Sequence, residues 1–565
     1  MTGVAAAAST RLERWTAGRV AERLWAKDGS LWSESGKAPD EVARWLGWLD
    51  LPEAMTARLG ELEHLARDVR EDGYGRAAVL GMGGSSLAPE LFSRFFGWAG
   101  GAEAGGAASA AGLELRILDS THPDAVRGFR SWASEQRTLF CVSSKSGSTT
   151  EPNAYQAAMA QSAPALDFLA ITDPGTALAE LARAQEFRGI VEAPADVGGR
   201  YSALTVFGLV PAVLNGVDVG GLLERARGMA SACREPNAAR NPGLRLGAAL
   251  GEAALEGRDK LTILTSARLA PFGDWVEQLV AESTGKSGRG IVPVVGEPVG
   301  EADAYGEDRV FVTLKLAGES IDGADDIIGE LRARGSLVEE IVLDDPLDLG
   351  AEFVRWEVAT AAAGIVLGID PFDQPNVQES KDATTALLEA YRNNGALPLP
   401  APLVSEPGIA VSADAASLGD TPVTVEGAVA QLLSLLQHGR DYFAILAYLP
   451  KDSEVEERLQ RIRERVRDAR GVATTLGFGP RFLHSTGQLH KGGPDTGVFL
   501  QITADASKDL PIPGWPVSFG TLIAAQALGD LASLQQRGRR ALRVHLDDRD
   551  DGLARLESMI ESVLR

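Results

Sequence analysis

Cysteine is scarce in this chain and long apolar runs are missing, and each shortage excludes a class of protein. Only Cys141 and Cys233 occur in 565 residues. Two cysteines cannot form the disulfide framework of a small secreted domain, so we expect a reducing cytoplasm. No apolar run approaches the roughly 18 residues that a membrane span needs, and the N-terminus lacks the basic and apolar regions of a signal peptide. We therefore expect neither membrane association nor secretion.

Positive charge is also in short supply. Lysine and arginine number 55 against 78 aspartates and glutamates, which gives a formal net charge of -23. A chain this acidic is not expected to bind nucleic acid or an anionic membrane as its main partner. The six histidines and two cysteines show no metal-ligand spacing, so no metal is expected.

The chain is long enough for two or three domains, and its apolar pattern divides it into three parts. Residues 1–72 have apolar side chains three and four apart, which predicts helices. Between 73 and 258, short apolar runs ending in Gly, Ser or Asp alternate with segments typical of helices. This alternation predicts an α/β domain whose parallel sheet is covered on both faces. The runs are "RAAVLGMG", "LELRILDS", "TLFCVSS" and "LDFLAITD".

The same rhythm restarts after residue 258 and predicts a second α/β domain over 259–565. The stretch around 393–424 is rich in Pro, Ala and Ser and is interpreted as an insertion. The glycine- and alanine-rich residues 97–112 are expected to form a flexible loop. The strands expected in this second domain are "DKLTILTSA", "GRGIVPVVG", "DRVFVTLK", "LVEEIVLDD", "DYFAILAYLP", "GVFLQITA" and "ALRVHLDD".

Two loops of the first domain have the composition of ligand-binding turns. "GMGGSS" follows the first strand and allows tight turns, but it is neither a complete dinucleotide fingerprint nor a phosphate loop of the Walker type. "SKSGSTT" places five hydroxyls where a helix begins. Helix N-termini favour phosphate, whereas ordinary capping needs only one hydroxyl. We interpret this loop as a phosphate cradle, with Lys145 and Arg200 as candidates for local attraction of the dianion.

Several motifs together resemble the phosphoglucose isomerase family, which is built from two sugar-isomerase (SIS-type) domains. The resemblance runs from about residue 75 to near the C-terminus and is greatest to the isomerase half of transaldolase–phosphoglucose isomerase fusions. It implies an α/β fold of two doubly wound parallel-sheet domains behind an N-terminal helical segment. That segment is far too short for an aldolase barrel. The motifs are "GMGGSSLAPE", "SKSGSTTEP", "VGGRYSAL", "AESTGKSGRG", "FDQPNVQESK" and "LHSTGQ".

The resemblance also implies the site. Glu282 would be the catalytic base, Arg200 would stabilise the charged intermediate, and Lys381 and His484 would open the sugar ring. One carboxylate can move a proton between neighbouring carbons, and a permanently charged guanidinium suits an enediolate. No metal or organic cofactor is needed. The expected substrate-binding residues are Gly84, Ser85, Ser144, Lys145, Ser146, Thr149, Gln278 and Gln374.

Two departures from the family pattern affect this assignment. Asn376 and Gln378 stand where the family has Gly and Glu, and His484 follows Lys381 along the chain although the family histidine precedes its lysine. His490 and Lys491 are the alternatives to His484. In the family this histidine usually comes from a second subunit, so a homodimer with shared sites is expected.

Several functions remain compatible with the motifs. The leading hypothesis is reversible isomerisation of glucose 6-phosphate and fructose 6-phosphate, in glycolysis and gluconeogenesis. An enzyme that also accepts mannose 6-phosphate is an alternative, because that sugar differs only at C2. A non-catalytic sugar-phosphate regulator would keep the hydroxyl cradle but has no need of Glu282, Arg200 and Lys381 together. A split complex with a separate transaldolase subunit is a further possibility.

Overall fold

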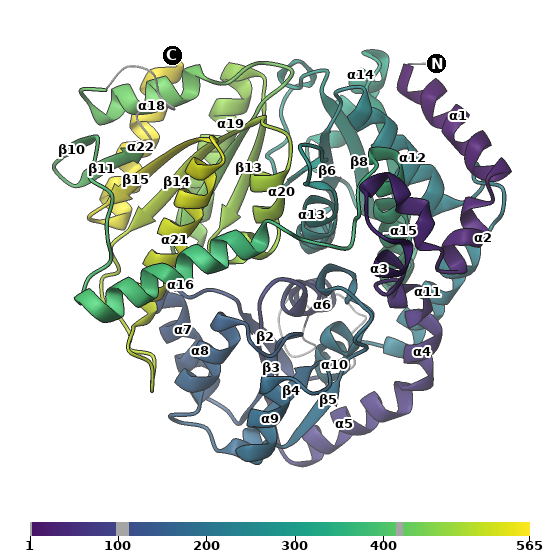
Figure 1. Cartoon of the computed structure of the whole chain (residues 1–565), viewed down its shortest axis with the longest axis horizontal. Coiled ribbons are helices and arrows are strands. Elements are labelled where there is room, and N and C mark those ends of the chain that lie inside the picture. Colours follow the sequence, from purple (N-terminus) through teal and green to yellow (C-terminus); the bar gives the residue numbers. More distant parts are fainter. Residues whose placement is uncertain (1–2, 98–111, 414–421) are drawn as a thin grey trace.

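The N-terminal segment is helical, as its periodicity predicts. In a computed structural model of the chain, residues 3–97, 112–413 and 422–565 are described (Figure 1). The glycine- and alanine-rich loop expected over 97–112 lies almost wholly outside this part. None of the described helices is both long and apolar enough to cross a bilayer. The N-terminal elements are α1 (Gly3–Ala17), α2 (Val20–Trp25), η1 (Gly29–Ser35), α3 (Pro39–Ala43), η2 (Gly47–Asp50), α4 (Leu51–Ala57) and α5 (Leu59–Glu71).

A five-stranded parallel sheet follows, in the order β2-β1-β3-β4-β5. Along the chain, the strand that follows β1 is added on one side of it, and β3, β4 and β5 are then added on its other side. The strand order thus switches direction between β1 and β3, and ligands of doubly wound sheets bind at such a switch point. The two polar loops follow these two strands. The elements are β1 (Arg76–Leu80), η3 (Gly83–Ser85), α6 (Leu87–Phe96), β2 (Glu114–Leu118), α7 (Pro123–Ser134), β3 (Thr138–Ser143), α8 (Thr150–Met159), η4 (Ala165–Asp167), β4 (Phe168–Thr172), α9 (Ala177–Ala184), β5 (Gly189–Glu192), η5 (Gly199–Tyr201), α10 (Val206–Asn215), α11 (Val219–Ala232) and α12 (Pro242–Leu255).

Beyond residue 258 the strands form two sheets. The first is parallel and four-stranded, in the order β7-β6-β8-β9. The helix that follows its first strand, α13, carries the expected base Glu282. The elements are β6 (Lys260–Thr265), η6 (Ala267–Leu269), α13 (Ala270–Thr284), β7 (Val292–Val295), η7 (Ala302–Ala304), β8 (Arg309–Leu316), α14 (Ala324–Ala333), β9 (Leu337–Leu343), η8 (Pro346–Asp348) and α15 (Leu349–Leu367).

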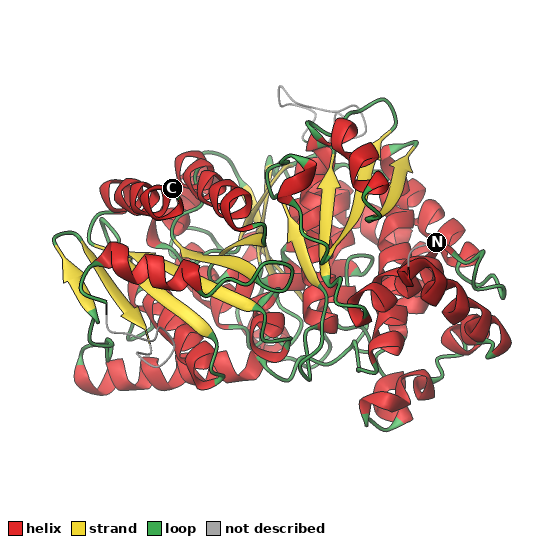
Figure 2. Cartoon of the chain, turned by 90° about the horizontal axis from the view of Figure 1, so that it is seen from above, coloured by secondary structure: helices red, strands yellow, loops and turns green. Residues whose placement is uncertain are grey.

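The other sheet has six strands in the order β10-β11-β15-β14-β12-β13, of which the last four are parallel. Helices cover both of its faces (Figure 2). This confirms the predicted α/β class with parallel sheets. The elements are α16 (Val377–Asn394), β10 (Val404–Glu406), β11 (Ile409–Ala413), α18 (Val425–Ser434), β12 (Tyr442–Tyr448), α19 (Ser453–Arg470), β13 (Ala473–Phe478), η9 (Arg481–His484), α20 (Gly487–Gly492), β14 (Gly497–Ala504), α21 (Phe519–Gln536), β15 (Arg540–Leu546) and α22 (Arg549–Leu564).

The Pro- and Ala-rich stretch around 393–424 contains strands, which its composition did not predict. β10 and β11 form an antiparallel pair, and β11 continues the six-stranded sheet by pairing antiparallel with β15. The stretch therefore extends the edge of the sheet. Residues 414–421 lie outside the described part.

Side chains join the two sheets where β7 lies close to β13. The buried guanidinium of Arg463 donates to the carbonyls of Val295, at 3.0 Å, and Thr474, at 2.6 Å. Glu297 accepts from the backbone N–H of Thr474 at 2.8 Å. Charge-assisted hydrogen bonds of this kind are stronger than neutral ones, so they hold the carboxyl end of β7 next to the amino end of β13.

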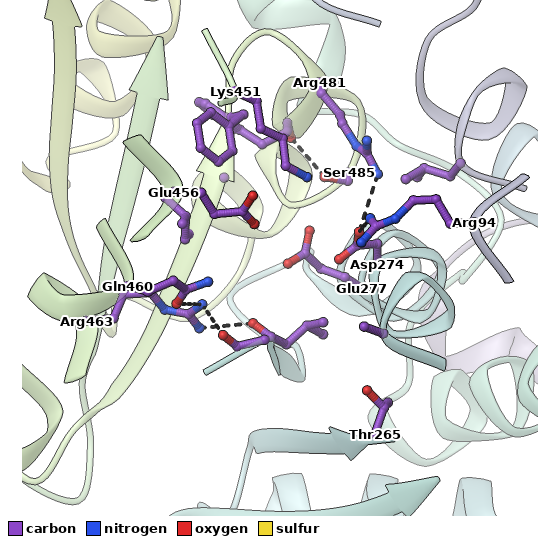
Figure 3. A pocket seen from close by; sticks show the side chains of 18 residues that line it. Arg94, Thr265, Asp274, Glu277, Lys451, Glu456, Gln460, Arg463, Arg481 and Ser485 are labelled. Atoms are coloured by element: carbon purple, nitrogen blue, oxygen red, sulfur yellow. Dashed lines mark hydrogen bonds and ion pairs between the residues drawn. The ribbon is translucent and has the colours of Figure 1, made fainter. Parts of the chain in front are cut away.

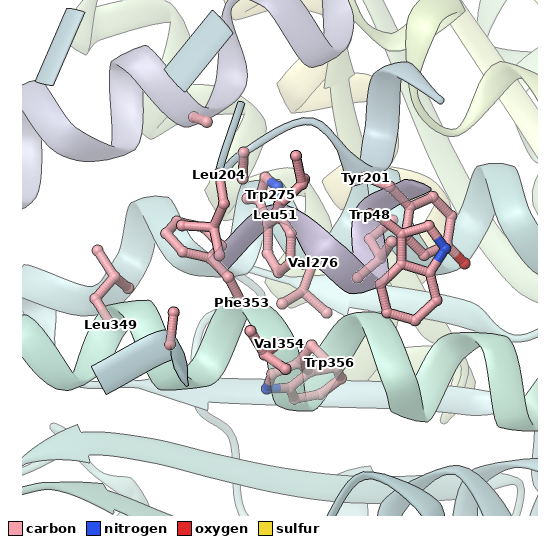
Figure 4. Packing of buried hydrophobic residues seen from close by; sticks show 14 of the residues in the cluster. Trp48, Leu51, Tyr201, Leu204, Trp275, Val276, Leu349, Phe353, Val354 and Trp356 are labelled. Carbon is pink, nitrogen blue, oxygen red and sulfur yellow. The ribbon is translucent and has the colours of Figure 1, made fainter. Parts of the chain in front are cut away.

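Aromatic packing connects the N-terminal helices to the site. Trp48 stacks on Tyr201 with ring centroids 5.2 Å apart, and Figure 4 shows this pair at the edge of the main core. Tyr201 in turn contacts Phe372 at 5.3 Å, and Trp32 contacts Phe372 edge-on at 5.1 Å. Each such pair contributes about 0.5–1.5 kcal/mol beyond area burial. The N-terminal segment thus fixes the backbone on either side of Arg200.

Candidate active site

The first polar loop is shaped by packing. A Cβ on Gly84 would lie 2.0 Å from the carbonyl oxygen of Gly199, so only glycine fits there. Gly83 has a φ of +57°, and a Cβ on it would lie 2.9 Å from the Cβ of His484. The glycines let the loop pass close to both η5 and η9. Three of the motif segments therefore meet at this point.

The hydroxyl-rich loop ends at the N-terminus of α8. Thr149 occupies the N-cap position, but its side chain makes no capping hydrogen bond to the helix. Its hydroxyl accepts from Ser144 at 2.9 Å instead, and Ser146 and Ser148 lie 3.0 Å apart. Free helix N–H groups beside several hydroxyls are what a phosphate group requires.

A cavity of about 280 Å³ opens at this loop. It brings together the end of the loop, the start of α16 and the end of η9, which are far apart in the sequence. Lys381 and His484 line it together with Ser146 and Thr149, so four of the residues singled out from the sequence share one cavity. Its lining residues are Ser146, Ser148, Thr149, Thr150, Glu151, Val377, Gln378, Ser380, Lys381, Thr384, Thr385, Leu388, Leu483, His484 and Gln526.

His484 is held by a buried carboxylate that was not assigned a role from the sequence. Its Nε2 lies 3.3 Å from Oε1 of Glu151, which also accepts from Gln526 at 2.6 Å. Burial acts to raise the pKa of Glu151, but the positive charges of His484 and Lys381 outweigh it and hold that pKa below the usual value. Glu151 therefore stays ionised and holds the imidazole of His484 in place.

Gln278 links the expected base to the same histidine. Its Nε2 donates to Oε2 of Glu282 at 3.3 Å and to the backbone carbonyl of His484 at 2.7 Å. Its Oε1 is buried and has no hydrogen-bond partner among the residues that the structure describes. Glu282 and His484 of one chain are therefore joined through one side chain. The expectation that this histidine comes from a second subunit is not needed to bring the two together.

Arg200 lies beside Glu282 in a nearly complete cage of acceptors. Its guanidinium is 3.6 Å from Oε1 of Glu282 and donates to Ser283 at 2.8 Å. It also donates to Oε1 of Gln374 at 2.9 Å and to the carbonyls of Pro371 and Asp373 at 2.7 and 2.9 Å. The segments "GGRYS", "AESTGK" and "FDQ" thus converge on one fixed positive charge.

A second buried cation holds the loop that cages Arg200. Lys286 donates to both the carbonyl and the carboxylate of Asp373, the latter at 2.8 Å. Burial, and then repulsion from Arg200, lowers the pKa of Lys286 to about 8. Lys286 closes the motif "AESTGK" and was missed, although its motif was recognised.

The helix α13 separates this site from a second polar cavity. Gln278 and Glu282 face the site, whereas Asp274 and Glu277 line a charged cavity of about 160 Å³ (Figure 3). There Arg481 pairs with Asp274 at 3.6 Å, and burial, with the nearby charge of Asp274, raises the pKa of Glu277 to about 8. The expected base Glu282 and the expected substrate contact Gln278 therefore lie next to each other, one turn apart on α13.

Some of the expected residues lie outside the cavity. Lys145 pairs with Asp173, and Gly84 and Ser85 pack against η5. Ser144 donates a hydrogen bond to the hydroxyl of Thr149, which does line the cavity. The cavity lining includes none of these four, and Glu282, Arg200, Gln278 and Gln374 are not among its residues either.

The alternatives to His484 are engaged elsewhere. Lys491 forms a buried ion pair with Asp530 at 2.7 Å. His490 packs against Phe499 and Tyr442, and burial lowers its pKa well below the usual value. Neither residue is among those that line the cavity, so His484 remains the histidine placed at the site.

The two departures from the family pattern have structural partners. The side-chain amide of Asn376 accepts a hydrogen bond from Gln488 at 2.7 Å and donates one to Glu379 at 2.8 Å. Gln378 lines the cavity and donates to Asp382 at 2.7 Å. Asn376 therefore ties the segment that carries Lys381 to the segment after His484, which compensates for the changed order along the chain.

Known proteins resemble this chain in sequence. It is 29% identical to a glucose-6-phosphate isomerase of Synechococcus sp. (strain JA-3-3Ab) over 424 aligned residues, which cover 63% of this chain and 77% of the relative. It is 28% identical to a glucose-6-phosphate isomerase of Symbiobacterium thermophilum, over 61% of this chain and 87% of the relative. No family model matches the chain.

Solved structures share its fold. A hypothetical protein of Thermus thermophilus aligns with a TM-score of 0.56 and 23% identity, over 67% of this chain and 96% of the other. A glucose-6-phosphate isomerase of Chlamydia trachomatis aligns with a TM-score of 0.50 and 19% identity, over 68% and 86%. The chain is thus similar in sequence to proteins named glucose-6-phosphate isomerase, and the solved structures show that it shares their fold.

Proposed function

We propose that this chain interconverts glucose 6-phosphate and fructose 6-phosphate as an aldose–ketose isomerase. The observation that carries the proposal is the link through Gln278, which joins a carboxylate, Glu282, to the backbone of an imidazole residue, His484. Arg200 supplies a permanent positive charge 3.6 Å from the carboxylate. A binding protein gains nothing from a base, an acid and a charge in this arrangement, whereas proton transfer next to a carbonyl requires all three.

The geometry suggests a role for each group. The substrate phosphate binds at the N-terminus of α8, where Ser146 and Thr149 donate hydrogen bonds. Protonated His484 gives a proton to the ring oxygen as the bond between that oxygen and the anomeric carbon breaks, which opens the ring. The proton of the anomeric hydroxyl passes to water, and the ammonium of Lys381 stabilises the oxygen that loses it. Glu282 then removes the proton from C2 and returns it to C1. Arg200 stabilises the negative charge of the enediolate between these two steps.

A coupled assay of the purified chain tests the proposal. Fructose 6-phosphate is supplied, and glucose 6-phosphate is detected through its oxidation by a dehydrogenase. We expect turnover in the wild type and a loss of about 10²–10⁴-fold in Glu282→Gln, which cannot accept the carbon proton. Glu277→Gln, on the same helix but in the neighbouring charged cavity, is the matched control and should turn over normally. Tight fructose 6-phosphate binding without turnover would indicate a regulator instead.

The same assay with mannose 6-phosphate measures the breadth of the reaction. C2 becomes planar in the enediolate, so the two epimers share this intermediate and differ only in the face that Glu282 protonates. A single fixed carboxylate returns the proton to one face. We therefore propose that glucose 6-phosphate is the preferred aldose.

We also propose a cytoplasmic location and a homodimer. Both cysteines are buried free thiols, which suits a reducing compartment. The dimer rests on the family resemblance, and light scattering of the purified chain measures it. A separate transaldolase subunit is tested by affinity purification from the native host, where its activity would copurify with the chain.

A further inference from the structure

A second cavity, larger than the catalytic one, lies against the six-stranded sheet at β11, β14 and β15. Its volume is about 710 Å³, within the range of small-molecule sites in proteins. The sheet face at β11, β14 and β15 forms one wall, α21 forms another, and residues 396–402 cross over the opening. We call these seven residues the strap. The lining residues are His122, Tyr391, Ala396, Leu397, Leu399, Pro400, Pro402, Ala410, Ser412, Tyr448, Thr503, Ala504, Asp505, Ala506, Asp509, Gly520, Thr521, Ile523, Ala524, Ala527, Arg543 and His545.

The sequence explains why space remains there. Side chains alternate between the two faces of a strand, and in β15 Leu542 and Val544 pack into the core on one face. Arg543 and His545 consequently face the cavity. The walls opposite are built largely of small residues, which leave room, while the strap contributes apolar leucines and prolines. The small residues are Ala410, Ala504, Ala506, Gly520, Ala524 and Ala527.

Arg543 brings a charge into this apolar space without a counterion. Its Nε is buried without a hydrogen-bond partner, and no ion pair or hydrogen bond engages its guanidinium within the described part of the chain. Burial lowers the pKa of Arg543, and the charge of Asp505 offsets this only in part. A half-buried guanidinium with unused donors gains charge-assisted hydrogen bonds when an anionic ligand pairs with it.

The carboxylates and histidines that line the cavity already have contacts of their own. His545 contacts Thr503 at 2.9 Å and Asp505 at 3.3 Å, and the Asp505 side chain is 71% exposed, at the mouth. Asp509 accepts from the backbone N–H of Gly520 at 2.8 Å. His122 caps α7 by accepting from Asp124. Arg543 is thus the cation of the cavity, and it has donors to offer.

We propose that this cavity binds a small amphipathic anion, whose apolar body lies under the strap and whose carboxylate, sulfonate or phosphate pairs with Arg543. The site is separate from the catalytic cavity but shares helices with it. α21 presents Gln526 to the catalytic cavity and Ile523 to this one, and α16 presents Lys381 to the first and Tyr391 to the second. The two helices lie side by side (Figure 1). This inference goes beyond the isomerase activity and does not depend on it.

Two fluorescent probes that differ by one charge test the proposal. Anilinonaphthalene sulfonate has an aromatic body and one sulfonate, and N-phenylnaphthylamine has the same body without the charge. We expect the native protein to bind the sulfonate about tenfold more tightly, because one charge-assisted pair contributes that much. Arg543→Met should remove this preference and leave isomerase turnover unchanged. Arg565→Met, which removes an exposed arginine, is the matched control.

Further measurements place the probe. Ala524→Phe fills the cavity and should weaken both dyes, whereas saturating fructose 6-phosphate should displace neither. Thermal unfolding of each variant shows that it is folded. The proposal is overturned if Arg543→Met binds the sulfonate as the wild type does, if Ala524→Phe leaves binding unchanged, or if the sugar phosphate displaces the dye.

Discussion

The imidazole of His484 lies 3.3 Å from the carboxylate of Glu151, although the two residues are 333 positions apart in the chain. Glu151 sits in the first turn of α8, directly after the phosphate cradle, while His484 ends η9. The pair therefore connects the part of the site that is proposed to bind phosphate to the part that is proposed to transfer protons. A buried, ionised carboxylate beside an imidazole holds the ring in place and stabilises its protonated form.

Replacing Glu151 with Gln is expected to lower kcat by about 10²-fold, the low end of the range for general acid–base catalysis. The amide keeps the size of the side chain but not its charge, so protonated His484 loses its partner. The loss should be larger for the ring-closed sugar than for the open-chain aldehyde, because only the former needs a ring-opening acid. Steady-state rates with the two forms of the substrate measure the difference. Equal losses would remove this role from the pair. Glu180→Gln, on α9, is the control.

The cradle is expected to act mainly on substrate affinity. Ser146→Ala combined with Thr149→Val removes two hydroxyls that line the cavity and should raise KM more than it lowers kcat. Phosphate is remote from the reacting carbons, so much of its binding is shared by the ground and transition states. The inhibition constant of 6-phosphogluconate should rise in parallel. An unchanged inhibition constant would place the phosphate elsewhere, and Ser162→Ala controls for the loss of a hydroxyl.

The site should be complete within one chain. Because Gln278 joins Glu282 and His484 of the same chain, coexpressing Glu282→Gln with His484→Ala should restore no activity. In a dimer whose sites were shared between subunits, roughly a quarter of the wild-type activity would return, since half of the mixed dimers' sites would be intact. Recovery of that size would assign His484 to the partner's site. Different affinity tags on the two coexpressed chains, purified one after the other, show whether mixed dimers form.

Most of the strands that were predicted from the sequence are buried on both faces, although β2 and β9, which are partly exposed, were predicted as well. β1, β3, β4 and β12 are continuous apolar runs, which is what parallel strands covered by helices require. β5 was missed because it has four residues and is mostly half-buried. β13 was missed because "ATTLGF" mixes polar and apolar residues. The division of the later strands into two sheets depends on strand order, which local pattern does not encode.

Prediction of the site residues is limited in the same way, because a local motif does not show which distant segments will contact it. Glu282, Arg200, Lys381 and His484 could be located because they lie in recognisable motifs. Glu151 also lies in a motif, but an acidic residue in the first turn of a helix is ordinary. Only its burial against an imidazole from a distant segment distinguishes it. The role of a buried carboxylate such as Glu151 can therefore be recognised only once the fold shows which residue it contacts.

Glu277 should make the protein less stable as the pH rises. Burial, and then the charge of Asp274, raises its pKa from 4.5 to about 8, with partial offset from Arg481, Arg463 and Lys451. Between these two values the unfolded chain has lost the proton while the native chain keeps it, so the free energy of unfolding falls as pH increases and levels off above about 8. Glu277→Gln has no proton to lose and should escape this decline.

Urea unfolding of both proteins at about pH 5 and about pH 8.5 should therefore show a stabilising effect of the substitution that is small at the lower pH and larger at the higher. Glu301→Gln, which removes an exposed carboxyl, controls for the change in net charge. A difference between Glu277→Gln and the wild type that is the same at both pH values would mean that Glu277 is ionised in the native charged cavity, and that Arg481 and Lys451 neutralise it.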